Sequence, residues 1–137
     1  MCVGNICRSP TAERMLKQNM PNKNITSAGI NALVGYDIDP EAASLLEANG
    51  YDASQHIARN LDRKMIVEAD LVLVMEKEQQ ALLTKHYPEA SGKIMMFGKW
   101  QNEADINDPY RKSSECFYYV FEKIEKNTTI WCKKLMD

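Results

Sequence analysis

Five consecutive apolar residues, Leu71-Val72-Leu73-Val74-Met75, restrict the fold of this 137-residue chain more than any other feature. An uninterrupted apolar run of this length is typical of a strand buried on both faces of a parallel sheet, whereas a strand with one solvated face alternates apolar and polar residues. Covering both faces requires helices on each side of the sheet. The run therefore predicts an α/β fold.

Helical patterns before and after this run agree with that class. Apolar residues at helical spacing predict helices over about 10–20, 40–49, 61–68, 76–86 and from 113 onward. Ser9 is interpreted as the N-cap of the first helix, and Asp39-Pro40 opens the second, which Gly50 ends. In the last helix the residues expected to face the core are Phe117, Val120, Phe121, Ile124, Trp131 and Leu135.

Short strands are expected at Ile25-Thr26-Ser27 and over 93–97. The polar stretch 98–112 is too long for a bare connector and is a candidate functional loop. The chain has no repeats and no linker-like segment, so we expect one domain over 1–137. The predicted architecture is a small parallel sheet of about four strands with helices on both faces.

Charge and composition exclude several classes of function. The 17 basic and 19 acidic residues give a net charge of −2, which argues against a nucleic-acid partner. No apolar run approaches the roughly 20 residues of a membrane span, and no signal-peptide pattern opens the chain, so a cytoplasmic location is expected. Two histidines and four cysteines without a Cys-x-x-Cys pair argue against a metal site. Cys116 and Cys132, on the last predicted helix, are expected to be packing residues.

The segment Cys2-Val3-Gly4-Asn5-Ile6-Cys7-Arg8-Ser9 carries the clearest chemistry. It is a glycine-containing loop that runs into a helix N-terminus, where backbone N–H groups and the helix dipole favour an anion. Arg8 adds a planar fork for two phosphoryl oxygens. A thiol at Cys2, at the bottom of this cradle, would be stabilised as the nucleophilic thiolate. The segment thus predicts an N-terminal phosphate-binding loop suited to attack on a phosphate monoester.

Plainer interpretations stay open for both candidate motifs. A cysteine and an arginine at this spacing also occur by chance, and a buried cysteine in a surface loop needs no chemistry. At the end of the polar loop, Asp108 of Asp108-Pro109-Tyr110 would supply the acid that protonates the leaving oxygen of a phosphate ester. Asp-Pro is also a common turn pair, however, so these residues alone do not decide.

Together these motifs resemble the low-molecular-weight protein-tyrosine phosphatases over essentially the whole chain. The segments that carry the resemblance fall in the family's order: Cys2–Pro10, Ala12-Glu13, Ser27-Ala28-Gly29, His56–Arg59, Met75-Glu76 and Asp108-Pro109-Tyr110. The bacterial branch that accompanies capsule and exopolysaccharide export is the most similar, through Ala32–Gly35, Phe97–Trp100 and Asp108–Ser113.

The resemblance implies a metal-independent protein-tyrosine phosphatase that works through a phosphocysteine and needs no cofactor. Cys2 would be the nucleophile, Arg8 would bind the phosphoryl oxygens, and Asp108 would be general acid and then general base. Ser9 would hydrogen-bond Cys2 and ease the loss of its thiolate. The phosphate and the aromatic ring of the substrate would contact Val3, Gly4, Asn5, Ile6, Cys7, Ser9, Leu33, Tyr36 and Tyr110.

Further residues would support the site if the resemblance holds. Asn5, Ser27 and His56 would form a hydrogen-bond network that keeps the loop in its strained shape; without the family, His56 is interpreted as a structural histidine. Cys7 would lie close enough to Cys2 for a reversible disulfide that protects the nucleophile from over-oxidation.

The chain departs from the family at two points. Members have an apolar strand before the nucleophile, whereas Met1 alone precedes Cys2. We therefore expect the first strand of the sheet to be missing from this chain and the sequence to begin inside a longer gene product. Arg111 stands where eukaryotic members have a second tyrosine, so regulation by phosphorylation of a tyrosine pair is not implied.

Three other functions compete with this interpretation. A protein-arginine phosphatase of the same fold has a small hydroxyl residue where this chain has Ile6, whose bulk suits a phosphotyrosine ring. A thiol-dependent arsenate reductase needs further redox cysteines, and none lies between positions 8 and 115. A non-catalytic phosphate-binding module would bind phosphate or vanadate without turnover.

The resemblance also implies partners for the chain. The substrate would be a phosphotyrosine protein, in particular an autophosphorylated bacterial membrane tyrosine kinase that governs polysaccharide export. The protein itself is expected to be a monomer or a weak dimer.

Overall fold

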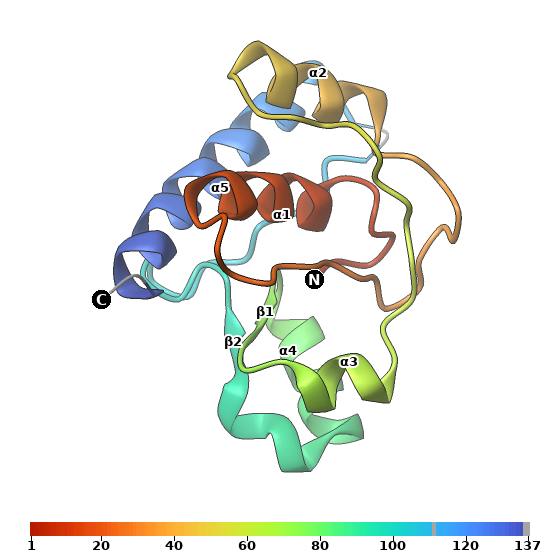
Figure 1. Cartoon of the computed structure of the whole chain (residues 1–137), viewed down its shortest axis with the longest axis vertical. Coiled ribbons are helices and arrows are strands. Elements are labelled where there is room, and N and C mark those ends of the chain that lie inside the picture. Colours follow the sequence, from red (N-terminus) through yellow and green to blue (C-terminus); the bar gives the residue numbers. More distant parts are fainter. Residues whose placement is uncertain (111, 136–137) are drawn as a thin grey trace.

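The computed structural model describes residues 1–110 and 112–135, and Figure 1 shows their arrangement. The elements follow in the order α1 (Arg8–Asn19), α2 (Pro40–Ala48), α3 (Arg63–Glu68), β1 (Val72–Val74), α4 (Lys77–His86), the 3-10 helix η1 (Pro88–Lys93), β2 (Ile94–Met96) and α5 (Ser114–Leu135). Every predicted helix is present within a few residues of its expected bounds.

The sheet is parallel and, within the described residues, has two paired strands extended by single bridges, where about four strands were predicted. β1 and β2 pair in parallel, with Val72 opposite Ile94 and Val74 opposite Met96. On the other side of β1, the amino group of Met1 donates a hydrogen bond to a β1 carbonyl.

The parallel arrangement continues beyond Met1 as single bridges. Cys2 forms a parallel bridge with Gly29, which forms another with Asn60. Cys2 therefore lies in the same row as the strands, and the loop that follows it emerges at their carboxyl edge, where parallel sheets commonly bind ligands.

Hydrophobic cores lie on both faces of this sheet. Val74, Ile94 and Met96 pack with residues of α3, α4 and η1, whereas Leu73 and Met95 pack against the larger core that α1, α2 and α5 form. Alternate strand residues thus face opposite cores, as a strand buried on both faces requires. Figure 1 shows α1, α2 and α5 in the upper part of the molecule and α3 and α4 in the lower part. The predicted α/β class with helices on both faces is confirmed.

The long helix α5 packs against α1 and is tied to the end of β2. Trp131 Nε1 donates a hydrogen bond of 2.7 Å to the carbonyl of Phe97, the residue after β2. The residues predicted to face the core are buried, apart from the half-buried Leu135. Of the helices in residues 1–110 and 112–135, none is long and apolar enough to cross a membrane.

The capping signals of α2 are correct, but that of α1 is wrong. Asp39 Oδ1 accepts the Glu41 N–H at 2.9 Å, and Gly50 has the left-handed φ of +84° that ends a helix. Ser9, in contrast, lies inside α1, which follows Cys7. Its hydroxyl contacts Cys2 Sγ at 2.9 Å, so a long-range partner replaces the local cap.

The strand predicted at 25–27 is wrong, because these residues form no ladder, whereas the strand predicted over 93–97 is present as β2. Within the described residues, pairing in this region is limited to the bridges of Gly29. The polar groups of Ser27 are used elsewhere: its carbonyl accepts from Arg59 Nε at 3.0 Å and its hydroxyl donates to Glu13 at 2.7 Å. Side-chain hydrogen bonds thus take the place of a backbone ladder there.

Candidate active site

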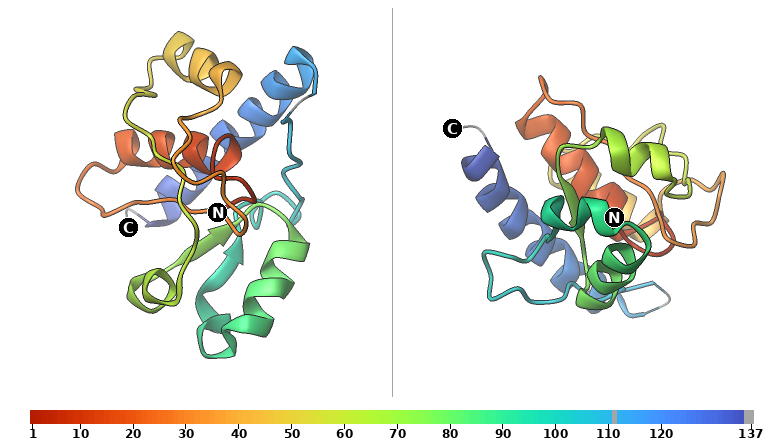
Figure 2. Two further views of the ribbon diagram at one scale, coloured as in Figure 1. Left: turned by 90° about the vertical axis from the view of Figure 1, so that its right-hand side faces the viewer. Right: turned by 90° about the horizontal axis from the view of Figure 1, so that it is seen from below.

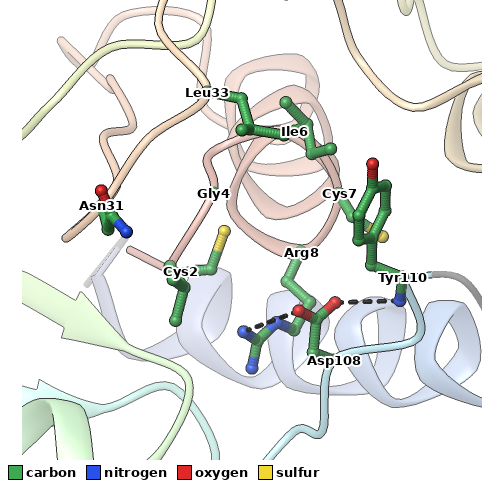
Figure 3. Close-up of a pocket in the computed structure, with 10 residues that line it drawn as sticks. Cys2, Gly4, Ile6, Cys7, Arg8, Asn31, Leu33, Asp108 and Tyr110 are labelled. Carbon is green, nitrogen blue, oxygen red and sulfur yellow. Dashed lines mark hydrogen bonds and ion pairs between the residues drawn. The ribbon is translucent and has the colours of Figure 1, made fainter.

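A pocket of about 190 Å³ opens at the carboxyl edge of the sheet (Figure 3). Three segments supply its walls: the loop before α1, the segment after Gly29, and the end of the polar loop that leads to α5. The lining residues are Cys2, Val3, Gly4, Ile6, Cys7, Arg8, Asn31, Leu33, Asp108 and Tyr110. The structure therefore brings most of the sequence-predicted site residues together.

The thiol of Cys2 is held at the bottom of this pocket. Its Sγ is 2.9 Å from Ser9 Oγ and accepts the Ser9 N–H at 3.4 Å, in the first turn of α1. Ser9 Oγ also accepts a hydrogen bond of 2.9 Å from Asn5 Nδ2. When Cys2 is a thiolate, the Ser9 hydroxyl and the Ser9 N–H both donate to the sulfur, which is the arrangement that stabilises that charge.

Asn5 fixes the shape of the loop, as the resemblance predicts. It has the left-handed φ of +57°, which asparagine tolerates better than most residues. Its backbone carbonyl is 2.6 Å from His56 Nε2, which must carry the hydrogen because a carbonyl only accepts. Its Nδ2 also reaches Ser27 Oγ at 3.0 Å, and its Oδ1 accepts the Arg59 N–H at 3.0 Å.

Two residues behind the loop take part although sequence reasoning gave them no role. Glu13, which is buried in α1, accepts the Ser27 hydroxyl and so ends the chain of hydrogen bonds that starts at Cys2. Gly29 packs so closely that a Cβ there would lie 2.4 Å from the Val3 carbonyl oxygen. Both belong to motifs that carried the resemblance. Glu13 ends the hydrogen-bond chain that supports the loop, and Gly29 allows close packing against the loop backbone.

Arg8 is buried to 1% exposure, although it carries the charge that would meet an anion. Its Nη1 donates to the Glu76 carboxylate and, at 2.8 Å, to the Ile106 carbonyl. Its Nη2 lies 3.8 Å from Asp108 Oδ2. Within the described residues, Nε has no hydrogen-bond partner.

The N-terminus of α4 holds Glu76 against Arg8. Glu76 occupies the N-cap position of α4 but makes no capping bond. Asp105 Oδ1, from the polar loop, accepts the N–H of Lys77 at 2.8 Å instead. Buried Gln79 donates from Nε2 to Glu76 Oε1 at 3.3 Å. Glu76, Gln79 and Asp105 thus form a clamp that holds the Arg8 guanidinium. None of the three was assigned this role from the sequence, although Met75-Glu76 was one of the segments that carry the resemblance.

Asp108 lies at the open side of the pocket. Its side chain is 46% exposed, and Oδ1 accepts the Tyr110 N–H at 3.0 Å. Figure 3 shows its carboxylate beside Arg8 and below the ring of Tyr110. It is therefore accessible to a ligand and to water, as an acid–base group must be.

Cys7 lines the same pocket as Cys2. Its burial raises its pKa well above the ordinary range, and the neighbouring Cys2 and Asp39 act in the same direction. Cys7 is consequently a neutral thiol at physiological pH. Its carbonyl accepts from Thr11 Oγ1 at 2.7 Å, which fixes the residue at the start of α1.

The structure differs from the sequence prediction at the rim of the pocket. Tyr36, predicted as a wall, is 61% exposed and is not among the lining residues, whereas Leu33 is. Tyr36 closes the turn that follows Leu33, with its N–H bonded to the Leu33 carbonyl at 3.0 Å. Asn31 lines the pocket although no sequence signal marked it. Arg111, named in the resemblance, lies outside the described residues.

Comparison with known proteins identifies one family. The family described as low molecular weight phosphotyrosine protein phosphatase matches residues 1–137. The low molecular weight protein-tyrosine-phosphatase Wzb of Salmonella typhimurium is 45% identical over 135 residues, which cover 98% of this chain and 91% of that protein.

Solved structures agree with this result. The tyrosine phosphatase AmsI of Erwinia amylovora superposes with a TM-score of 0.95 at 40% identity, over 99% of this chain and 90% of that one. Vibrio vulnificus Wzb in complex with benzylphosphonate gives 0.94 at 44% identity, over 98% and 94%. The YwlE arginine phosphatase of Geobacillus stearothermophilus gives 0.92 at 28% identity, over 98% and 89%.

We expect Glu76→Ala to lower kcat for p-nitrophenyl phosphate by about tenfold or more and to change inhibition by inorganic phosphate much less. The clamp aligns Arg8 with the transition state, whose geometry is more demanding than that of a bound ground state. Steady-state kinetics measure both quantities. Glu78→Ala, an exposed carboxylate of the same helix, is the control. Equal effects of the two variants would contradict a clamp at Glu76.

Proposed function

We propose the following mechanism from one premise: the chain belongs to the low molecular weight phosphotyrosine protein phosphatase family and hydrolyses phosphotyrosine in proteins. Cys2 is the nucleophile, Arg8 binds the phosphoryl group, and Asp108 is general acid and then general base. The observation that carries this assignment is that the three side chains line a single pocket (Figure 3).

In the first step the Cys2 thiolate attacks phosphorus, the S–P bond forms, and the P–O bond to tyrosine breaks. Protonated Asp108 gives its proton to the leaving oxygen, so tyrosine departs as a neutral phenol. Arg8 and the loop N–H groups bind the remaining phosphoryl oxygens. The buried Nε of Arg8 supports this role, because it has no partner in the described residues and an oxygen of the phosphate would supply one.

In the second step water attacks the phosphocysteine and Asp108 takes its proton. The S–P bond breaks, inorganic phosphate forms, and the sulfur leaves as a thiolate. Ser9 supports this departure, since its hydroxyl lies 2.9 Å and its N–H 3.4 Å from Sγ. Two donors on the sulfur lower the energy of the leaving thiolate.

Hydrolysis of p-nitrophenyl phosphate in the presence of EDTA tests these roles. Cys2→Ser should abolish turnover, and Asp108→Asn should lower kcat about 10²–10⁴-fold with little change in KM. The loss in Asp108→Asn should be greater for phosphotyrosine, because p-nitrophenolate leaves more readily without a proton. Asp70→Asn, an exposed carboxylate outside the pocket, is the control. Turnover by Cys2→Ser, or an unchanged kcat in Asp108→Asn, would refute the corresponding role.

Two apolar side chains favour an aromatic phosphoester over phosphoarginine. Ile6 and Leu33 lie on one side of the pocket in Figure 3, where a tyrosine ring would pack between them and Tyr110. The relative crystallised with benzylphosphonate, an aryl phosphate analogue, is 44% identical, whereas the arginine phosphatase is 28% identical. The pocket therefore favours phosphotyrosine over phosphoarginine.

Cys7 is proposed to protect Cys2 from oxidation. Peroxide would oxidise the Cys2 thiolate to a sulfenic acid; the Cys7 thiol would then attack that sulfur, releasing water and forming a disulfide. Both cysteines line the pocket, and the raised pKa of Cys7 leaves Cys2 as the first target.

Peroxide treatment should therefore inactivate the wild type reversibly, with activity restored by dithiothreitol. Cys7→Ala should lose activity irreversibly, while Cys116→Ser should behave like the wild type. Peptide mapping would identify the Cys2–Cys7 disulfide. Wild-type Cys2 found only as sulfinic acid would rule out this protection.

The substrate is proposed to be an autophosphorylated bacterial tyrosine kinase of a polysaccharide export system, met in the cytoplasm. The likeness to the bacterial relatives supports this partner. The chain should hydrolyse the phosphotyrosines of the purified cytoplasmic domain of such a kinase to tyrosine and inorganic phosphate, and Cys2→Ser should not. A kinase that keeps its phosphotyrosine while p-nitrophenyl phosphate is hydrolysed would contradict this partner alone.

A further inference from the structure

The turn Leu33–Tyr36 begins in the wall of the pocket, at Leu33. The Tyr36 N–H donates to the Leu33 carbonyl at 3.0 Å, and Gly35 has the φ of +87° that the third position of such a turn requires. The Leu33 N–H donates to the Gly4 carbonyl of the phosphate loop at 3.0 Å. The turn is thus fixed directly to the wall of the pocket.

The segment around Ile57 lies beside this turn. The Gly35 N–H donates to the Ala58 carbonyl at 2.9 Å, and the Ala58 N–H donates to the Tyr36 carbonyl at 2.8 Å. Figure 1 and the left view of Figure 2 show both segments side by side, near the loop that precedes α1. Their backbones hold each other in place.

Three apolar side chains of these two segments are exposed to solvent. Val34 is 61% exposed, Tyr36 61% and Ile57 69%; we call them the apolar rim. The backbone hydrogen bonds fix the two segments relative to each other. Grouped apolar side chains of this kind next to a pocket are typical of a binding surface, unlike scattered exposed ones.

We propose that the apolar rim binds an apolar side chain next to the phosphotyrosine of the substrate, so that this phosphatase prefers phosphotyrosine sites with apolar neighbours. This inference rests on the proposed function of the adjacent pocket. The pocket of about 190 Å³ around Cys2 would receive the phosphotyrosine side chain, and the residues that flank it would lie outside. Because Leu33 is in the pocket wall and Val34 is the next residue, flanking residues of a bound substrate can contact the rim.

Charges near the rim disfavour acidic neighbours. Asp37 is exposed directly after Tyr36. Arg59, close to Ile57 in sequence, is exposed too and donates from Nε to the Ser27 carbonyl at 3.0 Å. An acidic flank beside Tyr36 would meet the Asp37 carboxylate, whereas an apolar flank would bury surface of the rim.

Three phosphotyrosine peptides test the proposal. They carry two leucines, two serines or two glutamates on each side of the phosphotyrosine. For the wild type we expect kcat/KM to be about tenfold higher with leucine than with serine flanks, the size of effect that partial burial of one leucine gives, and lowest with glutamate flanks. Ile57→Ser and Val34→Ser should reduce the ratio of leucine to serine severalfold. Val67→Ser, a residue of α3 that is 62% exposed, is the matched control.

Turnover of p-nitrophenyl phosphate, which has no flanking residues, separates this proposal from the function of the pocket. Unchanged turnover in Ile57→Ser together with a reduced leucine preference supports the rim as a substrate surface. A leucine preference that is absent from the wild type, or equal in Ile57→Ser and Val67→Ser, overturns it while the phosphatase remains. The proposal is also overturned if Ile57→Ser leaves the peptide kinetics unchanged but dissociates a dimer in sedimentation, because a second copy of the chain would then cover the rim. A wild type without p-nitrophenyl phosphate turnover would instead refute the proposed function.

Discussion

A guanidinium with almost no exposure is stable only where carboxylates and carbonyls surround it, and Arg8 meets this condition through distant parts of the chain. Its partners Glu76 and Ile106 are 68 and 98 residues away in sequence. The Ile106 N–H in turn donates to the Met75 carbonyl at 2.8 Å, at the end of β1. The anion site therefore forms only together with the sheet, because Glu76 and Ile106, the partners of Arg8, both lie at the end of β1.

The phosphate loop depends on a second set of long-range bonds. Asn5 is held in a left-handed conformation by His56, Ser27 and Arg59, none of which is near it in sequence. These bonds leave the loop little freedom, so its N–H groups and the Cys2 sulfur are positioned before a ligand arrives. Preorganised donors of this kind lose no reorganisation energy when charge develops in the transition state.

The pocket and its rim differ in a way that suits their separate tasks. Around Cys2 and Arg8 the polar groups are buried and bonded to one another, which favours one geometry for one chemical group. At the rim, Val34 and Ile57 are apolar and exposed on a hydrogen-bonded backbone. Such a surface can discriminate among substrates by contact area without disturbing the reacting atoms.

The sequence by itself determined the fold class, the helices and the cap at Asp39, because these follow from local spacing and residue chemistry. The candidate roles of Cys2, Arg8 and Asp108 came from the loop pattern together with the family resemblance. Only the tertiary structure decided that Ser9 contacts Cys2 rather than capping the helix, that Glu76, Gln79 and Asp105 form the clamp for Arg8, and that Tyr36 is exposed outside the lining of the pocket. These outcomes depend on which distant groups the folded chain places next to each side chain. A serine before a proline, or a tyrosine in a turn, has the same local signal whichever partner it meets, so the folded chain alone selects among them.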